Sequence, residues 1–175
     1  MTTATEARSA AERLQAAWDA LALVPDPEVP VVSVCDLGLV RELHCDAEGT
    51  RVVLTPTYSG CPATEVIADS VRAALEGAGL GPVSLSQRLA PAWTSDWISE
   101  QGRELMRAYG IVPPGPAGCA SDVGLQPIRL RPHKLACPRC GSLDTERLAA
   151  FGSTACKALH RCLACLEPFE HFKPI

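Results

Sequence analysis

The sequence lacks several features that would each assign a protein to a class. No apolar run is long enough to cross a bilayer, and the N-terminus has no basic segment followed by an apolar one. Basic residues are scattered along the chain and the net charge is −4, which argues against an extended nucleic-acid-binding surface. No internal repeat is present. We therefore expect a cytoplasmic protein with neither a membrane nor a nucleic acid as partner.

The chain does have ordinary size and many cysteines. Its 175 residues and 47% hydrophobic content suffice for one domain of average size with a small appendage. In a cytoplasmic protein, nine cysteines indicate metal ligands or reactive thiols rather than disulfides, and the odd count agrees with that view.

The first part of the chain predicts a small α/β (α+β) domain of two layers. Ser9 and Glu12 form a capping box, and apolar residues follow at helical spacing until Pro25. Strands are expected at 39–44, 51–57 and 82–89, a second helix at 62–76 and a third from Trp97 to Tyr109. The apolar positions of the helices are Leu14, Trp18, Leu21, Ile67, Val71 and Leu75. The order α-β-β-α-β-α indicates a small sheet with its helices packed on one face.

The composition changes after this domain. Residues 113–132 are rich in proline and glycine and predict a linker, in which Cys119 is most simply an incidental cysteine. We therefore divide the chain into a domain at 1–112, the linker at 113–132 and a small metal-stapled ribbon at 133–175.

Two C-x-x-C knuckles lie in the last segment. Cys137 and Cys140 form one and Cys162 and Cys165 the other, with 21 residues between the two. Together they complete a tetrahedral site of four thiolates, and a segment this small needs such a staple to fold. Zinc is the expected metal, although iron or an iron–sulfur cluster takes the same ligands.

Three further residues in this segment could bind metal. Cys156 lies between the knuckles beside Lys157 and is either a small buried residue or a spare ligand or exchange thiol. His160 and His171 are expected to have surface or packing roles, because four cysteines already satisfy the metal.

Cys61 is the other chemically distinctive residue. Pro62 suits the first position of a helix, which would place Cys61 at or near the N-cap, where the helix dipole favours a thiolate. Glu65 opposes that effect. Taken alone, Cys61 is better explained as a small buried residue at a strand–helix junction.

Several segments carry a family resemblance. DPEVPV at 26–31, DLGLV at 36–40 and TPTYSGCP at 55–62 resemble the SufT-like metal–sulfur cluster biosynthesis domain. CPRCGS at 137–142, FGSTACK at 151–157, RC at 161–162 and EPF at 167–169 are more specific. In this order the two halves resemble the PaaD (PaaJ) family of bacterial phenylacetate degradation, with His160 where an aromatic residue is usual.

The resemblance implies an accessory component of the phenylacetyl-CoA 1,2-epoxidase, not catalytic by itself, that assembles or maintains an iron or iron–sulfur centre. Cys61 would be the transient iron or cluster ligand, supported by Thr57 and Ser59, and the ribbon would contact the client. The implied partners are the di-iron oxygenase and the iron–sulfur flavin reductase, and a homodimer is possible.

Three other functions stay open from the sequence. An electron-transfer or structural subunit of the oxygenase would need iron in the knuckles, because zinc has no redox chemistry. A nucleic-acid-binding zinc ribbon conflicts with the acidic balance and with the lack of an aromatic and basic surface. A hydrolytic or transferase enzyme could use Asp26, Glu28 and Asp36, but Asp26 and Glu28 lie in a proline-rich turn where capping is an equally good role.

Overall fold

The structure is a computed structural model that describes residues 9–46, 48–115 and 134–175. It forms two compact units, one within Met1–Trp93 and Trp97–Gly102 and the other within Thr94–Asp96 and Arg103–Ile175. No helix of the described residues is long and apolar enough to span a membrane. The predicted linker, apart from 113–115, and Cys119 lie outside the described residues, so the boundaries of the linker stay a prediction.

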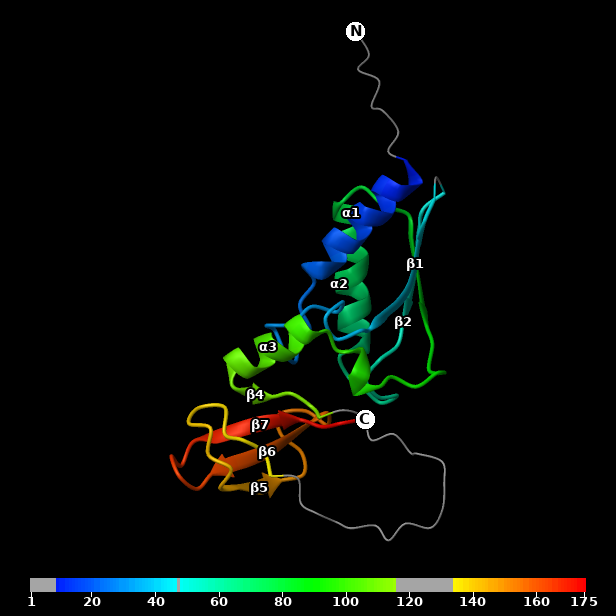
Figure 1. The fold of residues 1–175 in the computed structure, drawn as a ribbon. Coiled ribbons are helices and arrows are strands. Elements are labelled where there is room, and N and C mark those ends of the chain that lie inside the picture. The colour runs from blue at the N-terminus through cyan, green and yellow to red at the C-terminus, as the bar shows by residue number, and fades with distance from the viewer. Residues whose placement is uncertain (1–8, 47, 116–133) are drawn as a thin grey trace, which may run out of the picture. The chain divides into compact units, whose positions relative to one another are not determined.

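The first unit has the predicted two layers. Its three-stranded sheet has the order β1-β2-β3, with β1 antiparallel and β3 parallel to β2. Helix α2 connects the two parallel strands, and α1 and α2 lie on one face of the sheet (Figure 1). The elements of this unit are α1 (Ala10–Ala22), β1 (Val40–Cys45), β2 (Thr50–Leu54), α2 (Thr64–Gly77) and β3 (Val83–Gln87). A 3₁₀ turn (Ser95–Trp97) and α3 (Glu100–Tyr109) each have residues in both units.

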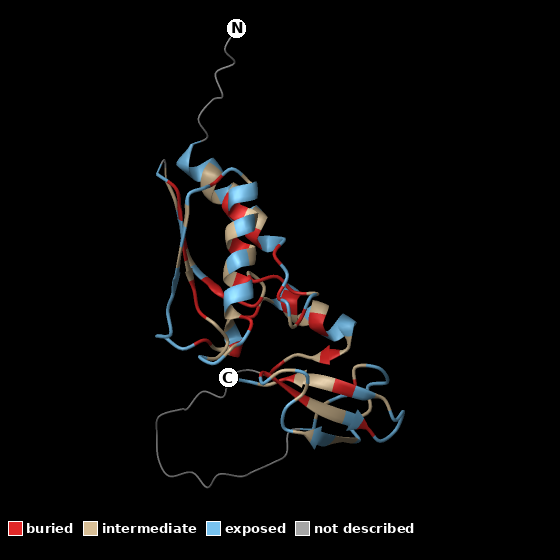
Figure 2. Cartoon of the chain, turned by 180° about the vertical axis from the view of Figure 1, so that it is seen from behind, coloured by how far each residue is buried: buried red, intermediate tan, exposed pale blue. Residues whose placement is uncertain are grey.

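The core of this unit forms where the helices meet the sheet (Figure 2). Ile67, Val71 and Leu75 of α2 are all buried, as their spacing predicts. Helix α1 buries Leu21 together with Ala17, whereas Trp18 is 36% exposed. The expectation that Trp18 belongs to the apolar face is therefore wrong, because the helix turns the small Ala17 side chain inward instead.

The helix starts reflect local hydrogen bonding. Helix α1 has the predicted capping box, with Glu12 N donating to Ser9 Oγ at 3.3 Å and Ser9 N donating to Glu12 Oε2 at 2.7 Å. Helix α2 starts at Thr64 rather than Pro62, with Ala63 as an N-cap that makes no side-chain hydrogen bond. The third helix also starts later than predicted, because Ser95–Trp97 forms a separate 3₁₀ turn.

The second unit is built on a four-stranded sheet of order β4-β7-β6-β5. The strands are β4 (Ile111–Val112), β5 (Thr145–Ala149), β6 (Lys157–Cys162) and β7 (Pro168–Phe172). The sequence predicts ribbon strands at 146–151 and 160–161, which correspond to β5 and β6. It predicts neither β7 nor β4, which pairs in parallel with β7 just before the predicted linker. A small cluster of Cys137, Cys162 and Phe169, with Val112 and Leu135 packed against it, forms the core around the knuckles.

Candidate metal centre and thiol pocket

The first knuckle is a tight turn closed by backbone hydrogen bonds. Gly141 N donates to Cys137 O at 2.9 Å, and Cys137 N donates to Ser142 O at 2.9 Å. Gly141 has a left-handed backbone with φ +74°, which costs a glycine little. This turn brings Cys137 and Cys140 to the same side of the chain.

The second knuckle has the same geometry, but a leucine takes the position that Gly141 has in the first knuckle. Cys162 N donates to Glu167 O at 3.0 Å, in the same way as Cys137 N donates to Ser142 O. Cys165 N donates to Cys162 Sγ at 3.4 Å. The residue after the second cysteine is Leu166, whose φ of +64° is unfavourable for a side chain with a Cβ atom.

The two knuckles bring four sulfur atoms together near the end of β6, where Cys162 lies. The four Sγ atoms, of Cys137, Cys140, Cys162 and Cys165, all lie within 4.8 Å of one another. Cys137 Sγ is 3.7 Å from Cys165 Sγ, and Cys140 Sγ is 3.6 Å from Cys162 Sγ. A tetrahedral zinc with Zn–S bonds of about 2.3 Å requires S–S separations of about 3.8 Å. The four-cysteine arrangement therefore fits a bound metal ion.

The thiol of Cys162 has a lowered pKa. The N–H of Cys165, which points at the sulfur of Cys162, lowers the pKa of Cys162 to about 6. A thiolate, the form that binds metal, is therefore available at this position at neutral pH. When loaded, the site has four protein ligands and no open position, which is typical of a structural site.

The other candidate ligands of this unit lie in different surroundings. Cys156 is buried, and its Sγ lies 3.0 Å from Thr154 Oγ1. It does not belong to the four-sulfur group found among the described residues, so its role as an extra ligand stays a prediction. Beside it, Lys157 Nζ pairs with Glu170 Oε2 at 2.9 Å, and the Lys157 side chain is only 4% exposed.

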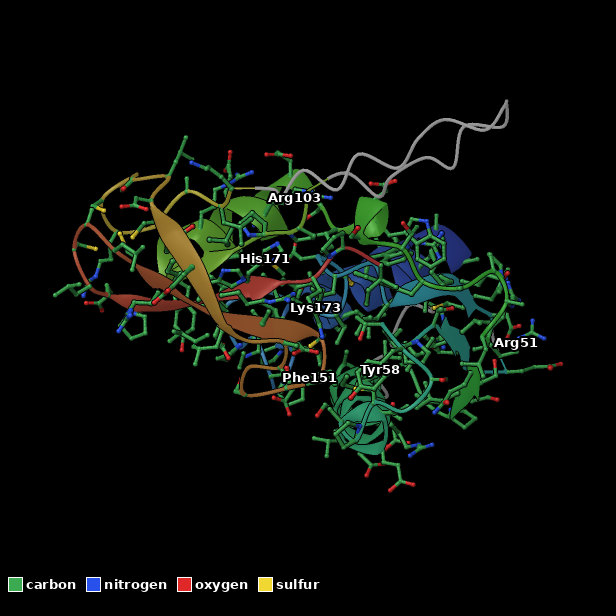
Figure 3. All side chains as sticks on the ribbon, turned by 90° about the horizontal axis from the view of Figure 1, so that it is seen from below. Arg51, Tyr58, Arg103, Phe151, His171 and Lys173 are labelled. Carbon is green, nitrogen blue, oxygen red and sulfur yellow. The ribbon has the colours of Figure 1, made fainter. Side chains whose placement is uncertain are left out.

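The two histidines pack against the sheet. The ring of His160 stacks on Phe169 with centroids 5.6 Å apart and meets His171 edge-on at 5.8 Å. Burial, with the charge of Arg147 as a second cause, lowers the pKa of His160. Elsewhere on this unit, Lys173 Nζ lies 4.3 Å from the ring centroid of the exposed Phe151 (Figure 3).

Cys61 lies in the first unit, in the loop between β2 and α2. Cys61 N donates to Tyr58 O at 3.3 Å, and Thr64 Oγ1 donates to Cys61 O at 2.8 Å. These turns place Cys61 two residues before the N-cap Ala63, so it is not the capping residue itself. Its side chain is half-buried rather than fully open to solvent.

Cys61 borders a small pocket of about 30 Å³. Part of the wall is apolar, from Leu39, Leu54, Pro56 and Ile67, and the polar part comes from Asp26, Thr55, Thr57, Thr64 and Cys61. Thr57, predicted to support Cys61, therefore does line the same pocket, whereas the exposed Ser59 does not belong to this lining. Thr55, which is 1% exposed, also lines the pocket, and no signal in the sequence predicts this position.

The acidic turn before β1 forms another wall of this pocket. Asp26 Oδ1 accepts hydrogen bonds of 2.9 Å from both Glu28 N and Val29 N, which is the capping role considered for this turn. Asp26 is also buried, at 7% exposure, and it lines the pocket. Its sequence position alone could not place it near Cys61.

Asp36 holds two loops of the first unit together. Its Oδ2 accepts from Ser33 Oγ at 2.7 Å, and its Oδ1 accepts from Ser99 Oγ at 2.7 Å. Burial raises the pKa of this carboxyl, but the hydrogen bonds from Ser99 and Ser33 outweigh it and the pKa is lowered. The described contacts of Asp36 are thus structural.

Comparisons with known proteins assign a family to each unit. Residues 14–84 match the family of iron-sulfur cluster assembly proteins, and residues 127–173 match the PaaD zinc beta ribbon domain. A solved domain of unknown function, DUF59, from Bacillus anthracis has the same fold over 54% of this chain and 91% of its own, with a TM-score of 0.51 and 23% identity.

Two relatives cover different lengths of the chain. A protein of Escherichia coli (strain K12), assigned as one of the subunits of a 1,2-phenylacetyl-CoA epoxidase, is 46% identical over 90% of this chain and 91% of its own. A Porphyromonas gingivalis (strain ATCC BAA-308 / W83) Fe-S protein maturation auxiliary factor is 37% identical over 46% of this chain and 78% of its own. The first similarity spans both units, and the second covers about half of the chain.

Proposed function

Because the chain belongs to the PaaD-like family, with an iron–sulfur assembly domain followed by a PaaD zinc ribbon, we propose that it serves a phenylacetyl-CoA epoxidase as an accessory component. Its role there is to assemble or maintain the iron or iron–sulfur centre of the system. The di-iron oxygenase and the iron–sulfur flavin reductase are its partners. The chain does not catalyse the epoxidation by itself.

The observation that carries this proposal is the presence of two unlike thiol sites in one chain. The four cysteines of the ribbon can supply all four ligands of a metal ion, and two of them, Cys137 and Cys162, are buried. Cys61 is a single half-buried thiol beside a pocket. A site with one protein thiolate leaves positions open, so it can receive cargo and release it, whereas a closed site retains its metal.

In this proposal the ribbon and the loop of Cys61 have different roles. A zinc ion bound by the four cysteines would hold β5, β6 and β7 together and so shape a surface for the client. Cys61 binds the cargo, and Thr57 and Ser59 shape its loop. The similarity of the first unit to Fe-S maturation factors supports this division.

One observation favours a second function. Cys140 and Cys165 are exposed, and the N–H of Cys165 points at a ligand sulfur. An iron ion held in this way could exchange electrons with a partner, and the chain would then be an electron-transfer component of the oxygenase. The match to a zinc ribbon family supports the first function instead.

Reconstitution of the epoxidase separates the two functions. The other components are produced with and without this chain, under exclusion of oxygen, and their iron content and turnover are measured. An assembly factor raises the iron content, and fully loaded components then turn over without it. If components with full iron content still need the chain for every turnover, electron transfer is the correct function and assembly is not.

A further inference from the structure

A residue in the wall of the pocket beside Cys61 has a buried hydroxyl group with no hydrogen-bond partner among the described residues. Thr55 is 1% exposed, and its Oγ1 makes no hydrogen bond within the described structure. Its backbone is fixed, because Thr55 N donates to Leu39 O at 2.8 Å. A buried hydroxyl left unpaired costs about 1–3 kcal/mol, so such a group at the wall of a pocket points to a ligand that pairs with it.

The size of the pocket limits what this ligand can be. The volume of about 30 Å³ compares with the roughly 10–15 Å³ that one water molecule needs. One large atom, or two small ones, therefore fits beside Cys61. An iron–sulfur cluster, which contains several iron and sulfide atoms, would have to extend beyond this space.

The chemistry of the wall limits it further. A divalent cation requires four to six oxygen, nitrogen or sulfur ligands. Most of the accessible surface of the wall is apolar, and one oxygen of its carboxylate, Asp26 Oδ1, already accepts two backbone N–H groups. A polarisable sulfur atom bound covalently to Cys61 needs no such ligand set, and a single hydroxyl donor suits it.

We infer that this pocket holds one sulfane sulfur, carried by Cys61 as a persulfide, with the Thr55 hydroxyl donating a hydrogen bond to the terminal sulfur. The inference rests on the proposed function, because it names the cargo that this thiol carries for a metal–sulfur centre. Thr55 is a positioning residue and Cys61 is the carrier.

The transfer balances without any further oxidant or reductant. The Cys61 thiolate attacks the outer sulfur of a donor persulfide, a new S–S bond forms at Cys61, and the donor leaves as its thiolate. Release is the same exchange in reverse: the thiolate of an acceptor protein attacks the terminal sulfur, and Cys61 leaves as a thiolate. The sulfane sulfur keeps its oxidation state throughout.

Glutathione persulfide provides the test. The full chain, loaded with zinc, is incubated with this donor and freed of it, and mass spectrometry of its peptides follows the added sulfur atom over time. We expect Cys61 to gain one sulfur, and Thr55→Val to lose it about tenfold faster than the wild-type chain, since a hydrogen bond to a charged sulfur is lost. Thr55→Ser, which keeps the hydroxyl, should retain the sulfur as the wild type does.

Two controls keep the result interpretable. Cys45, also a half-buried thiol of the first unit, should not retain sulfur, because it does not line the pocket. Thr55→Val should unfold at the same or a higher denaturant concentration, because it removes an unpaired hydroxyl rather than a hydrogen bond. A stable variant that loses sulfur quickly therefore cannot be explained by misfolding.

Either of two results overturns the inference: no sulfur at Cys61, or equal retention in Thr55→Val and the wild type. Both leave the proposed function intact if the chain still raises the iron content of the epoxidase components. If that iron content does not depend on the chain, the proposed function itself fails, whatever happens at Cys61.

Discussion

Gly141 and Leu166 occupy equivalent positions in the two knuckles and share a left-handed backbone, with φ +74° and +64°. Each directly follows the second cysteine of its knuckle. Among the described residues, Leu166 is the one non-glycine residue in this conformation, and its side chain is 68% exposed. The ribbon thus carries a conformational cost at the second knuckle that it avoids at the first.

Leu166→Gly should therefore stabilise the ribbon. The left-handed conformation costs a residue with a Cβ atom roughly 1–2 kcal/mol, part of which the greater freedom of glycine in the unfolded chain offsets. We expect a net gain of about 1 kcal/mol, measured as slower zinc release to a chelator in denaturant. Gly141→Ala is the matched control and should release zinc faster. Destabilisation by Leu166→Gly would contradict this account of the strain.

Replacing Cys140 or Cys162 by serine should release the metal and unfold the ribbon. Metal-dependent folding of such segments is worth on the order of 10 kcal/mol. Metal analysis gives the zinc content, and hydrogen exchange should show β5, β6 and β7 unprotected while α1 and α2 stay protected. Cys156→Ser is the control, because Cys156 lies outside the four-sulfur group, and it should keep its zinc. An unchanged zinc content in both variants would show that these cysteines are not the metal ligands.

Asp36 should make the first unit sensitive to acid. Because the pKa of this carboxyl is lowered in the folded state, its contribution is present above the unfolded value of 3.8 and is lost as the pH falls through the lower folded value. Asp36→Asn should cost about 2 kcal/mol at neutral pH, since hydrogen bonds to a charged group are lost, and should flatten the acid dependence.

Tryptophan fluorescence measures this directly, because Trp18, Trp93 and Trp97 all belong to the first unit. Denaturant titrations at several pH values, in the wild type and in Asp36→Asn, give the two slopes. The same slope in both proteins would show that Asp36 does not cause the acid dependence.

The ion pair of Lys157 and Glu170 should be costly to break from one side. Glu170→Gln removes the negative charge that pairs with the nearly buried Lys157 ammonium and should destabilise the ribbon by about 2–3 kcal/mol. The double variant Lys157→Met, Glu170→Leu removes both charges and should recover most of this loss. The rate of zinc release in denaturant is measured for the wild type and the two variants. An unchanged rate in Glu170→Gln would mean that the ion pair contributes little to the stability of the ribbon.

Local signals in the sequence were sufficient for much of the fold. The capping box of Ser9 and Glu12 and the spacing of Ile67, Val71 and Leu75 each depend on residues a few positions apart. Strands β7 and β4 were not predicted, because they have only five and two residues and show no clear alternation of apolar and polar residues. Their pairing with each other also joins segments that are distant in the sequence. Trp18 was misplaced because spacing alone cannot tell which side of α1 is turned toward the sheet.

The functional residues divide in the same way. The four-cysteine group was predictable, because two C-x-x-C turns leave few other geometries for their sulfur atoms. The thiol pocket was not, since it depends on Asp26 meeting Thr55 and Cys61 across separate loops of the first unit. An unpaired buried hydroxyl such as that of Thr55 has no sequence signature, because it is defined by the partners it lacks.

The most direct test of the account is the iron content of epoxidase components that are produced together with the Cys61→Ser variant. Cys45→Ser, which changes a half-buried cysteine of the same unit outside the pocket, is the matched control. We predict that both variants fold and keep their zinc, and that the iron or cluster content of the client falls with Cys61→Ser alone, together with phenylacetyl-CoA turnover. Full iron content and full turnover with folded Cys61→Ser would show that Cys61 is a packing residue and would contradict the assembly role.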